Sequence, residues 1–496
     1  MSMATLQHRL IRGLAIGSAT LLIATGIAGT ALAQGRDDDS EVPPAEDPVQ
    51  DNASDEGEFL DDELFDDGLD ALLGGGEFVD DTAEGDPEPS ALTGWKGFLE
   101  LRPRIYFKDR NQDRNDEQLI LEGEMEFDFR LRESTTAYFR PRIFLDVLDG
   151  DNDRFEPYEL YVTEAGDGWD LRAGQFVENW GIADTYNPID VVNRRDLATG
   201  ILDTERMGEL GLRYRSFFDG GETIGEPTVS AYVLPVWRPT PFPSEDQRFG
   251  FGGGATPFDE DDGFEPEGSE RAFYGLRFQS TWNTAPANSD LQLVVAHGPE
   301  RMPFVAMGPS AVVPVYYGAT TIGLGLRTVP NQDSLGDFLA SLTLKAEVVY
   351  KSPFAFDASP IIDPQDYLAY VLGVDRSFYD LFADQDQLTM TIEYAGEDGA
   401  IDGPSVLRPL ASDLILRGLW EANDFARTSF ELRGIFDLER DEQIAEAVFE
   451  RQLRGWNEDL KLIVQLQHFD AADPGESLFS VLPDNSSLLI GLRLDF

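Results

Sequence analysis

Apolar and charged residues alternate with a period of two along most of the chain after residue 95. The segment 118–132 shows this most clearly, because Leu119, Phe127 and other apolar residues are separated by single, mostly acidic residues. A β-strand directs successive side chains to opposite faces, so the pattern predicts strands with one apolar and one charged face. The chain is expected to be all-β from here to its end.

About eighteen segments follow this pattern, and each is close to or longer than the ~9–11 residues that a tilted strand needs to cross a bilayer. Residues 312–328 can hold one strand or two, and a total of sixteen remains possible. The predicted strands cover residues 95–107, 118–132, 135–147, 155–165, 168–178, 209–218, 227–237, 271–282, 290–297, 312–328, 338–352, 365–376, 386–396, 412–421, 427–437, 443–454, 457–468 and 486–496.

Charged residues recur on one face of several successive strands. Such a face cannot sit in a dry core, but it can line a water-filled lumen while the apolar face contacts lipid. The sequence therefore predicts a transmembrane antiparallel β-barrel of about 18 strands. Two interpretations of the charges remain open: opposed rows that select solutes by charge, or ion pairs between neighbouring strands that satisfy the wall. The candidate pore-lining residues are Arg102, Arg104, Glu122, Glu124, Glu126, Arg140, Arg142, Arg172 and Arg213.

Connection lengths support the barrel independently. Long and short connections alternate, with residues 179–208, 238–270, 397–411 and 469–485 among the long ones and 132–134 and 166–167 among the short ones. Outer-membrane barrels have short turns on the periplasmic rim and long loops on the other. Both termini of the barrel are therefore expected on the short-turn, periplasmic rim.

The chain ends on an alternating strand. Leu488, Ile490, Leu492, Leu494 and Phe496 are apolar, and most residues between them are not. A terminal strand of this kind resembles the closing strand of bacterial outer-membrane barrels, which their assembly machinery recognises. The resemblance implies that this machinery is a partner of the chain, beside outer-membrane lipid and lipopolysaccharide.

One segment of about 25 residues carries a motif. It contains Leu171-Arg172-Ala173-Gly174-Gln175, then Trp180-Gly181, then Asn187-Pro188-Ile189-Asp190. The order resembles the form "LRxGxQxxxWG" followed by "NPxD" in a family of large proteobacterial outer-membrane barrels of unassigned function, related to alginate-export and porin-like barrels. The motif residues are Gly174, Trp180, Gly181, Asn187, Pro188 and Asp190.

The motif runs into the third long connection, 179–208. In porins generally the third external loop folds inward and narrows the pore. By this resemblance the segment is expected to fold into the lumen, with Asp190, Arg194, Arg195 and Asp196 at the constriction. A rigid external cap is the alternative.

The first 92 residues differ from the rest. Residues 1–33 have the form of a cleaved secretory signal, with Arg9 and Arg12 before an apolar stretch and Ala31-Leu32-Ala33 at the cleavage site. Residues 34–92 hold about twenty Asp and Glu against one Arg and are expected to be mostly disordered in the periplasm. The barrel is assigned to 93–496, and the predicted location is the outer membrane of a Gram-negative bacterium.

Within the acidic part, residues 59–73 carry apolar residues at spacings of three to five, which could share one side of a short helix. A docking site for a periplasmic partner, a plug for the barrel mouth and a plain tether all remain open.

Composition narrows the chemistry. The chain has no cysteine, a net charge of −55 and a pI of about 4.1. Disulfides and thiolate metal sites are excluded, and nucleic acid is not expected as a partner because phosphates need a cationic surface. No G-x-S-x-G, H-E-x-x-H, P-loop or dinucleotide motif occurs, so no enzymatic activity, metal or cofactor is expected.

These observations favour a porin-like channel that passes a small or amphipathic solute through a lumen narrowed by an inward-folded loop. The alternative is a non-conducting outer-membrane barrel that acts as a scaffold, an adhesin or a docking partner of an envelope complex.

Overall fold

In a computed structural model the described residues begin at Leu92. The predicted signal peptide, the acidic segment up to residue 91 and the patch 59–73 lie outside them, so the predicted boundaries of these parts stay predictions. The structure describes residues 92–107, 116–148, 150, 153–200, 204–243, 248, 266, 268–284, 287–307, 311–330, 339, 341–354, 365–399, 406–407, 410, 412–440, 442–471 and 485–496.

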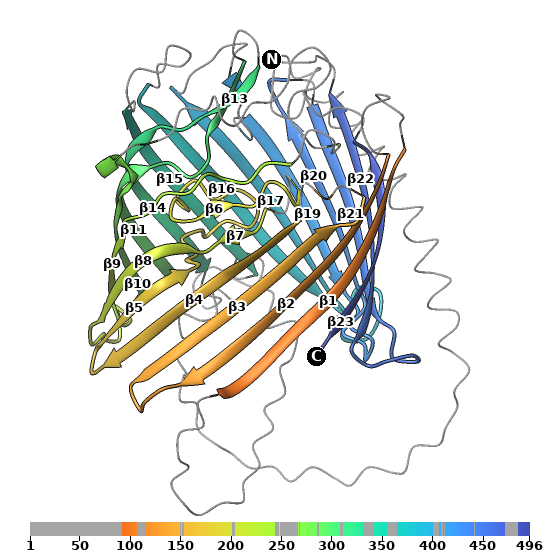
Figure 1. The fold of residues 1–496 in the computed structure, drawn as a ribbon, viewed down its shortest axis with the longest axis horizontal. Coiled ribbons are helices and arrows are strands. Elements are labelled where there is room, and N and C mark those ends of the chain that lie inside the picture. The colour runs from red at the N-terminus through yellow and green to blue at the C-terminus, as the bar shows by residue number, and fades with distance from the viewer. Residues whose placement is uncertain are drawn as a thin grey trace, which may run out of the picture. The chain divides into compact units, whose positions relative to one another are not determined.

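Eighteen strands form one antiparallel sheet that closes on itself (Figure 1). Each strand pairs with its neighbours along the chain, and the first pairs with the last. The barrel strands are β1 (Leu92–Tyr106), β2 (Glu117–Arg130), β3 (Thr135–Asp146), β4 (Arg154–Gly166), β5 (Trp169–Phe176), β8 (Glu209–Phe217), β9 (Thr228–Leu234), β10 (Phe273–Thr284), β11 (Ala287–Pro299), β14 (Gly318–Pro330), β15 (Leu342–Phe354), β16 (Tyr367–Tyr379), β17 (Gln387–Asp398), β19 (Ser412–Glu421), β20 (Ser429–Asp437), β21 (Glu442–Gln452), β22 (Leu460–Ala471) and β23 (Ser487–Asp495).

The predicted count of eighteen barrel strands is confirmed. The segment 312–328 holds β13 (Val312–Val315) and most of β14, and only β14 joins the barrel. The short strands are too brief for a period to show in the sequence. β13 forms a separate sheet with β12 (Phe304–Met307) and β18 (Val406–Leu407), and β6 (Arg194–Arg195) pairs with β7 (Arg206–Met207). One short 3₁₀-helix, η3, spans Gly268–Arg271.

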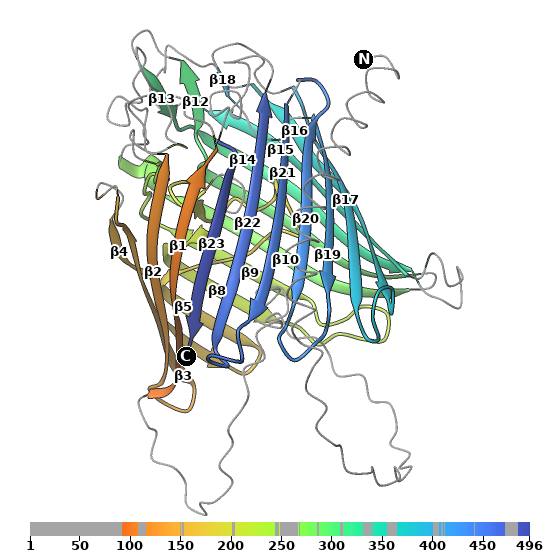
Figure 2. The same cartoon turned by 90° about the vertical axis from the view of Figure 1, so that its right-hand side faces the viewer.

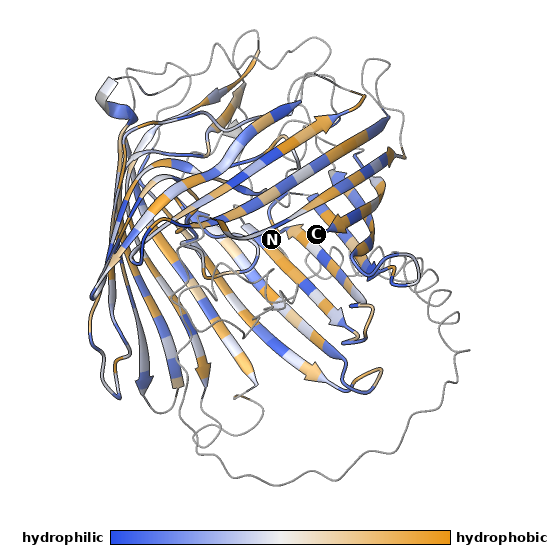
Figure 3. Cartoon of the chain, turned by 60° about the horizontal axis from the view of Figure 1, so that its bottom comes forward, coloured by the Kyte–Doolittle hydropathy of each residue, from blue (hydrophilic) through white to orange (hydrophobic). Residues whose placement is uncertain are grey.

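The two faces of the barrel differ as the alternation predicts. Leu99, Leu101 and Ile105 of β1 are exposed on the outer face, whereas Glu100 and Arg104 between them are buried. Figure 3 shows the same alternation of hydropathy along many strands. An apolar outer face around a charged interior is the arrangement of a transmembrane β-barrel. Within the described residues, no helix has the length and apolarity to cross a membrane.

The first and last strands complete the ring. Leu99 of β1 is the partner of Leu494 of β23, and the Gly97 N–H donates a hydrogen bond of 2.8 Å to the Phe496 carbonyl. The start of β1 also pairs with the end of β2, next to the short turn at residues 131–134. Both ends of the barrel therefore lie at the short-turn rim, as predicted. That this rim faces the periplasm stays a prediction.

Candidate functional site

The connection between β5 and β8, residues 177–208, enters the barrel instead of leaving it (Figure 1). The Trp180 carbonyl accepts a hydrogen bond of 2.6 Å from Gln292 of β11, and the Asp184 N–H donates one of 2.7 Å to Glu393 of β17. From β5, the ring runs through β8, β9, β10, β11, β14, β15 and β16, so β17 is the eighth strand after β5 in a ring of eighteen. The loop reaches almost the opposite wall.

At its far end the loop is held by two carboxylates of the wall. Glu347 of β15 accepts hydrogen bonds from the N–H groups of Ile182, Ala183 and Ile189, at 2.5, 3.0 and 3.2 Å. Glu393 accepts from Asp184 and from the next residue, Thr185. Neither glutamate is exposed. We call residues 182–185 with Glu347 and Glu393 the tip.

The two glutamates have small or apolar cross-strand neighbours. Glu347 lies between Gly325 and Val371, and Glu393 lies between Gly373 and Ile415. No arginine stands beside them in the sheet, so a buried carboxylate at these places needs donors from elsewhere. The backbone N–H groups of the loop supply them.

The tip also has one ion pair and an apolar contact. Lys345 Nζ lies 2.6 Å from Asp184 Oδ2 and 2.5 Å from Asp375 Oδ2. Ala183 and Tyr186 pack on buried apolar residues that line the inner wall from β16 to β22 and on Tyr106 of β1. The tip is therefore fixed by hydrogen bonds, charge and packing together.

Glycines on the inner wall make room for the loop. A Cβ at Gly325 would lie 2.4 Å from Ile182 Cδ1, and one at Gly323 would lie 2.9 Å from Ile189 Cγ1. A larger residue at either position would force the side chain of Ile182 or Ile189 to move. The wall is thus shaped to receive this segment.

Closer to its origin, the loop is held by ion pairs around Asp190. The Asp190 carboxylate is 2.5 Å from Arg195 Nη2 and 2.7 Å from Arg206 Nε, and Arg206 also donates to Asn179 Oδ1 at 2.7 Å. Burial alone would raise the pKa of Asp190, but the guanidinium groups of Arg206 and Arg195 outweigh burial and lower this pKa. Asp190 therefore stays ionised and joins two distant parts of the loop.

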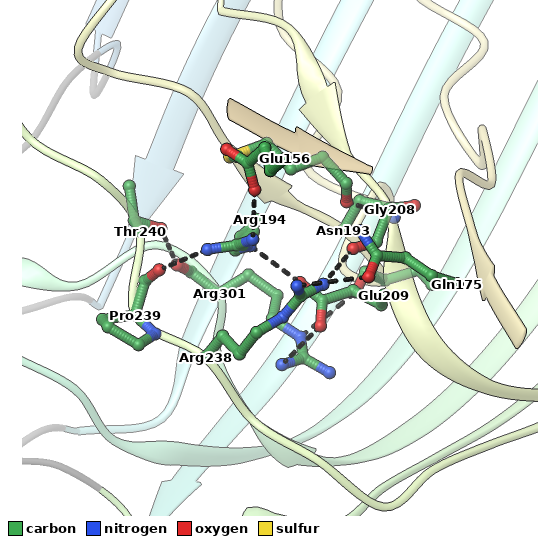
Figure 4. A network of polar contacts seen from close by, with 12 residues as sticks. Glu156, Gln175, Asn193, Arg194, Gly208, Glu209, Arg238, Pro239, Thr240 and Arg301 are labelled. Carbon is green, nitrogen blue, oxygen red and sulfur yellow. Dashed lines mark hydrogen bonds and ion pairs between the residues drawn. The ribbon is translucent and has the colours of Figure 1, made fainter. Parts of the chain in front are cut away.

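A second network ties the loop to the long-loop rim (Figure 4). Glu209, at the start of β8, is unexposed and lies 3.4 Å from Arg194 Nε and 3.6 Å from Arg301 Nη1. Arg194 donates to the Pro239 carbonyl at 3.0 Å, and Arg301 donates to the Val192 carbonyl at 3.1 Å. These bonds join the loop to the connections that follow β9 and β11. We call this network and the Asp190 cluster the root.

The motif residues build the start of the loop. Gly174 has φ +137°, and a Cβ there would lie 2.3 Å from the Leu160 carbonyl oxygen, so only glycine fits. Gly181 lies against the Asn187 side chain, where a Cβ would approach within 2.2 Å. Trp180 is fully buried and meets the Tyr232 ring edge to face at 5.2 Å. Pro188 lies in the turn that the Asp190 N–H closes on the Asn187 carbonyl.

The four charges predicted for a constriction are mostly buried within the loop's own network. Asp190 and Arg194 have the partners given above, and Asp196 lies 2.8 Å from Arg154 of β4. Arg195 alone of the four keeps a fifth of its side chain exposed. Their place at a constriction stays a prediction, and the surface that three of them offer to a solute is small.

The charged residues predicted on the inner wall are paired. Glu122 lies between Arg102 and Arg142, and Arg140 is 2.8 Å from Glu124. The remaining predicted residues also have polar partners: Arg104 with Gln465 and Gln467, Glu126 with Tyr138 and Lys96, Arg172 with Glu178 and the Tyr161 ring, and Arg213 with Asp170 and Glu178. This is the arrangement that interstrand ion pairing predicts.

The loop also reaches back to the wall near its own origin. Glu205 forms an ion pair with Arg142 of β3 and accepts a hydrogen bond of 3.1 Å from the Tyr158 hydroxyl of β4. Desolvation at the wall opposes ionisation of Glu205, although nearly half of its side chain is exposed, and Arg142 and then Arg140 outweigh this and lower its pKa. Contacts therefore run across the lumen from β3 to β17.

Sequence reasoning missed Glu347, Glu393, Glu209 and Arg301. The alternation places Glu347 and Glu393 on the inner face, and their lack of basic cross-strand neighbours was a usable signal. A partner that is a backbone N–H 165 residues earlier in the chain leaves no side-chain pattern. Among the described residues no group of three or more His, Cys, Asp or Glu could hold a metal ion.

Solved structures with a similar barrel include OccK2 (OpdF) of Pseudomonas aeruginosa in complex with glucuronate, at 12% identity and a TM-score of 0.46 over 82% of this chain and 97% of that one. OpdK of Pseudomonas aeruginosa with vanillate is similar at 9% identity and a TM-score of 0.45, over 82% of this chain and 100% of that one. A loop-deletion mutant of OmpT, an outer membrane protein of Vibrio cholerae, is similar at 9% identity and a TM-score of 0.36, over the same shares.

No protein-family model and no curated protein matches the chain. The resemblance of the segment 171–190 to a family of outer-membrane barrels therefore stays a prediction.

Proposed function

We propose that this chain is an outer-membrane, porin-like channel that passes small or amphipathic solutes through a lumen narrowed by the loop 177–208. The apolar outer face suits a bilayer, and the charged inner face suits water. A closed barrel of eighteen strands is wide enough to hold an aqueous passage beside an inward loop.

The loop carries the proposal. It is attached at its root to β4, β8 and the long-loop rim, and at its tip to β15 and β17. A segment fixed at both ends across a lumen reduces the free cross-section permanently, not only when it happens to swing inward. The hydrogen bonds and ion pairs given above anchor the loop to β3, β4, β8, β11, β15 and β17. We place the passage along the sector β19 to β23 with β1, where Ala183 and Tyr186 make apolar contacts.

The charges of that sector suggest which solutes can pass through the channel. Arg417 and Glu431 lie 2.7 Å apart, Lys461 and Glu450 lie 3.2 Å apart, and each keeps part of its side chain exposed. Within each of these two pairs the opposite charges cancel beyond a few ångströms. We infer that the passage favours small polar or zwitterionic solutes and discriminates weakly between anions and cations.

A second function is favoured by the extent of the loop's contacts. Because they run from β3 to β17, the loop could close the lumen and leave a non-conducting barrel that serves as a scaffold, an adhesin or a docking partner.

Single-channel recording in planar bilayers separates the two. The full chain should show discrete conductance steps, and a variant without residues 185–198 should show larger ones. A matched control removes residues 472–484, a connection of similar length between β22 and β23, and should stay near the parent conductance.

An unchanged conductance after removal of 185–198 would reject the loop as the narrowing element. A silent parent with a conducting deletion variant would favour the closed barrel, and silence of both would reject the channel.

A further inference from the structure

Exposed aromatic side chains line one stretch of the short-turn rim. Phe425, Trp456 and Phe382 are 88%, 83% and 72% exposed, and the first two are the most exposed large apolar side chains among the described residues. They lie in the turns that join β19 to β20, β21 to β22 and β16 to β17, along the side seen in Figure 2. Trp95 of β1, 57% exposed, continues the row beside Phe496. We call these four residues the rim row.

Three members of the row lie beyond the barrel wall. Phe382 is three residues past the end of β16 at Tyr379, Phe425 is four past Glu421, and Trp456 is four past Gln452. Aromatic girdles at a lipid boundary stand on strand ends, where Trp420 lies. The turn residues instead bring apolar surface to the aqueous side of the rim, where exposed apolar patches mark interaction sites.

The turns that carry Phe382 and Phe425 are braced against each other. Trp420 Nε1 donates to Asp386 Oδ2 at 2.8 Å, and Asn423 Nδ2 donates to the Gln385 carbonyl at 2.7 Å. Asp386 also accepts the N–H groups of Leu381, Phe382 and Ala383. Because these hydrogen bonds brace the two turns, Phe382 and Phe425 keep their positions instead of folding back onto the barrel wall.

The same two turns hold unusual backbone conformations. Among the described residues five that are not glycine have positive φ, and four of these are Asp380, Gln385, Asn423 and Arg427, at +54°, +70°, +49° and +47°. Such conformations are unfavourable for residues with a Cβ and persist only where the surroundings impose them. The strain is concentrated where the exposed phenylalanines are.

We propose that the rim row is the docking surface for residues 59–73 of the same chain. That segment carries Phe59, Leu60, Leu64, Phe65, Leu69, Leu72 and Leu73. Apolar surface on the rim and apolar side chains on the segment are both removed from water when the two meet. The proposal does not rest on the channel function.

Chain length permits this contact. Eighteen residues, 74–91, separate Leu73 from Leu92, which begins β1 at the same rim. They extend to at most about 60 Å. From β1 to β16 through β23, β22, β21, β20, β19 and β17 there are seven strand spacings, or about 34 Å. A tether this short holds the segment at a high effective concentration beside the row, an advantage that a free partner lacks.

Cysteine pairs test the docking, because the natural chain has no cysteine. Leu64→Cys combined with Phe425→Cys or with Trp456→Cys should form an intramolecular disulfide under mild oxidation in the folded, membrane-inserted full chain. The matched control combines Leu64→Cys with Phe218→Cys, a half-exposed aromatic residue in the short turn between β8 and β9. It should react several-fold more slowly. Equal rates for all three pairs would overturn the proposal.

An environment-sensitive dye on Phe425→Cys gives a second measurement that needs no cross-link. Its emission should shift to shorter wavelength in the full chain and return to longer wavelength when residues 36–90 are removed. A dye on Phe218→Cys should not respond. Emission that is independent of residues 36–90 but quenched by brominated lipid would overturn the proposal in favour of lipid. Disulfides that form only between chains would overturn it in favour of a second copy.

Discussion

At the root of the loop, arginine side chains surround buried carboxylates of the loop and of β8, whereas at the tip the wall supplies the carboxylates and the loop supplies backbone N–H groups. The root depends on the identity of each partner, since replacing either member leaves a buried charge alone. The tip depends on the shape of the backbone, because every residue but proline has an N–H. The root therefore determines how the loop folds, and the tip determines where the folded loop rests.

The largest effect is expected at the root. Asp190→Asn leaves Arg195 and Arg206 without their shared anion. Because both arginines are about a fifth exposed, the loss should be about 2–3 kcal/mol, below the ~3–5 kcal/mol of a fully buried pair. The loop should lose its fold, so conductance becomes larger and noisy and proteases cleave within residues 187–208. Asp219→Asn, on an exposed turn, is the control; equal noise in both variants would contradict the assignment.

A smaller and different effect is expected at the tip. Glu347→Gln with Glu393→Gln weakens five hydrogen bonds of a kind worth about 1.5–3 kcal/mol each when the acceptor is charged, although the amide oxygens still accept some of them. A net loss of about 2 kcal/mol changes the ratio of docked to released loop roughly 30-fold. Because the root is intact, the channel should switch between two discrete conductance levels.

Glu431→Gln with Glu450→Gln is the matched control for the tip. Both residues are on the inner wall, their ion pairs are with Arg417 and Lys461, and the substitution changes the lumen charge by the same amount. This variant should shift ion selectivity toward anions without a second level. Two-level switching in the control, or protease cleavage of the loop in the tip variant, would mean that root and tip do not act separately.

The smallest effect concerns pH. The pKa values of Asp190 and Glu205 are lowered, so the stability that they add is present above the ordinary carboxylate range near pH 4 and is lost as the pH falls through their lowered folded values. The root should therefore hold between pH 7 and about pH 5. Conductance recorded over this range tests the prediction. A change of conductance near neutral pH that comes from the root would be inconsistent with the lowered pKa values of Asp190 and Glu205.

Much of the barrel could be predicted because its information is local. Alternation along 118–132 or 487–496 fixes which side chains face lipid, and the position of each strand follows without knowledge of its neighbours. The motif found Trp180, Gly181 and Asp190, which turn out to shape the root. The four-residue strand β12 and the two-residue strands β18, β6 and β7 were missed, because such lengths hold no period.

The candidate site could be predicted only where side chains pair with side chains. Arg102, Glu122 and Arg142 lie on adjacent strands, so their ion pairs follow from register. Glu347 and Glu393 bind the backbone of a distant segment, and the charges of Arg194 and Asp196 say nothing of how deeply they are buried. How deeply a side chain is buried and which backbone groups it binds depend on the folded loop, and the alternation of apolar and charged residues does not encode that loop.

The seam between β1 and β23 has a consequence for how the molecule is made. This seam pairs β1 with β23, the barrel strand farthest from it along the chain, so the cylinder stays open until all eighteen strands are in place. Until then the sheet has two unpaired edge strands, which can pair with any other extended polypeptide. A chain without β23 would have no closed form, which makes Ser487–Asp495 as important to the barrel as any other strand.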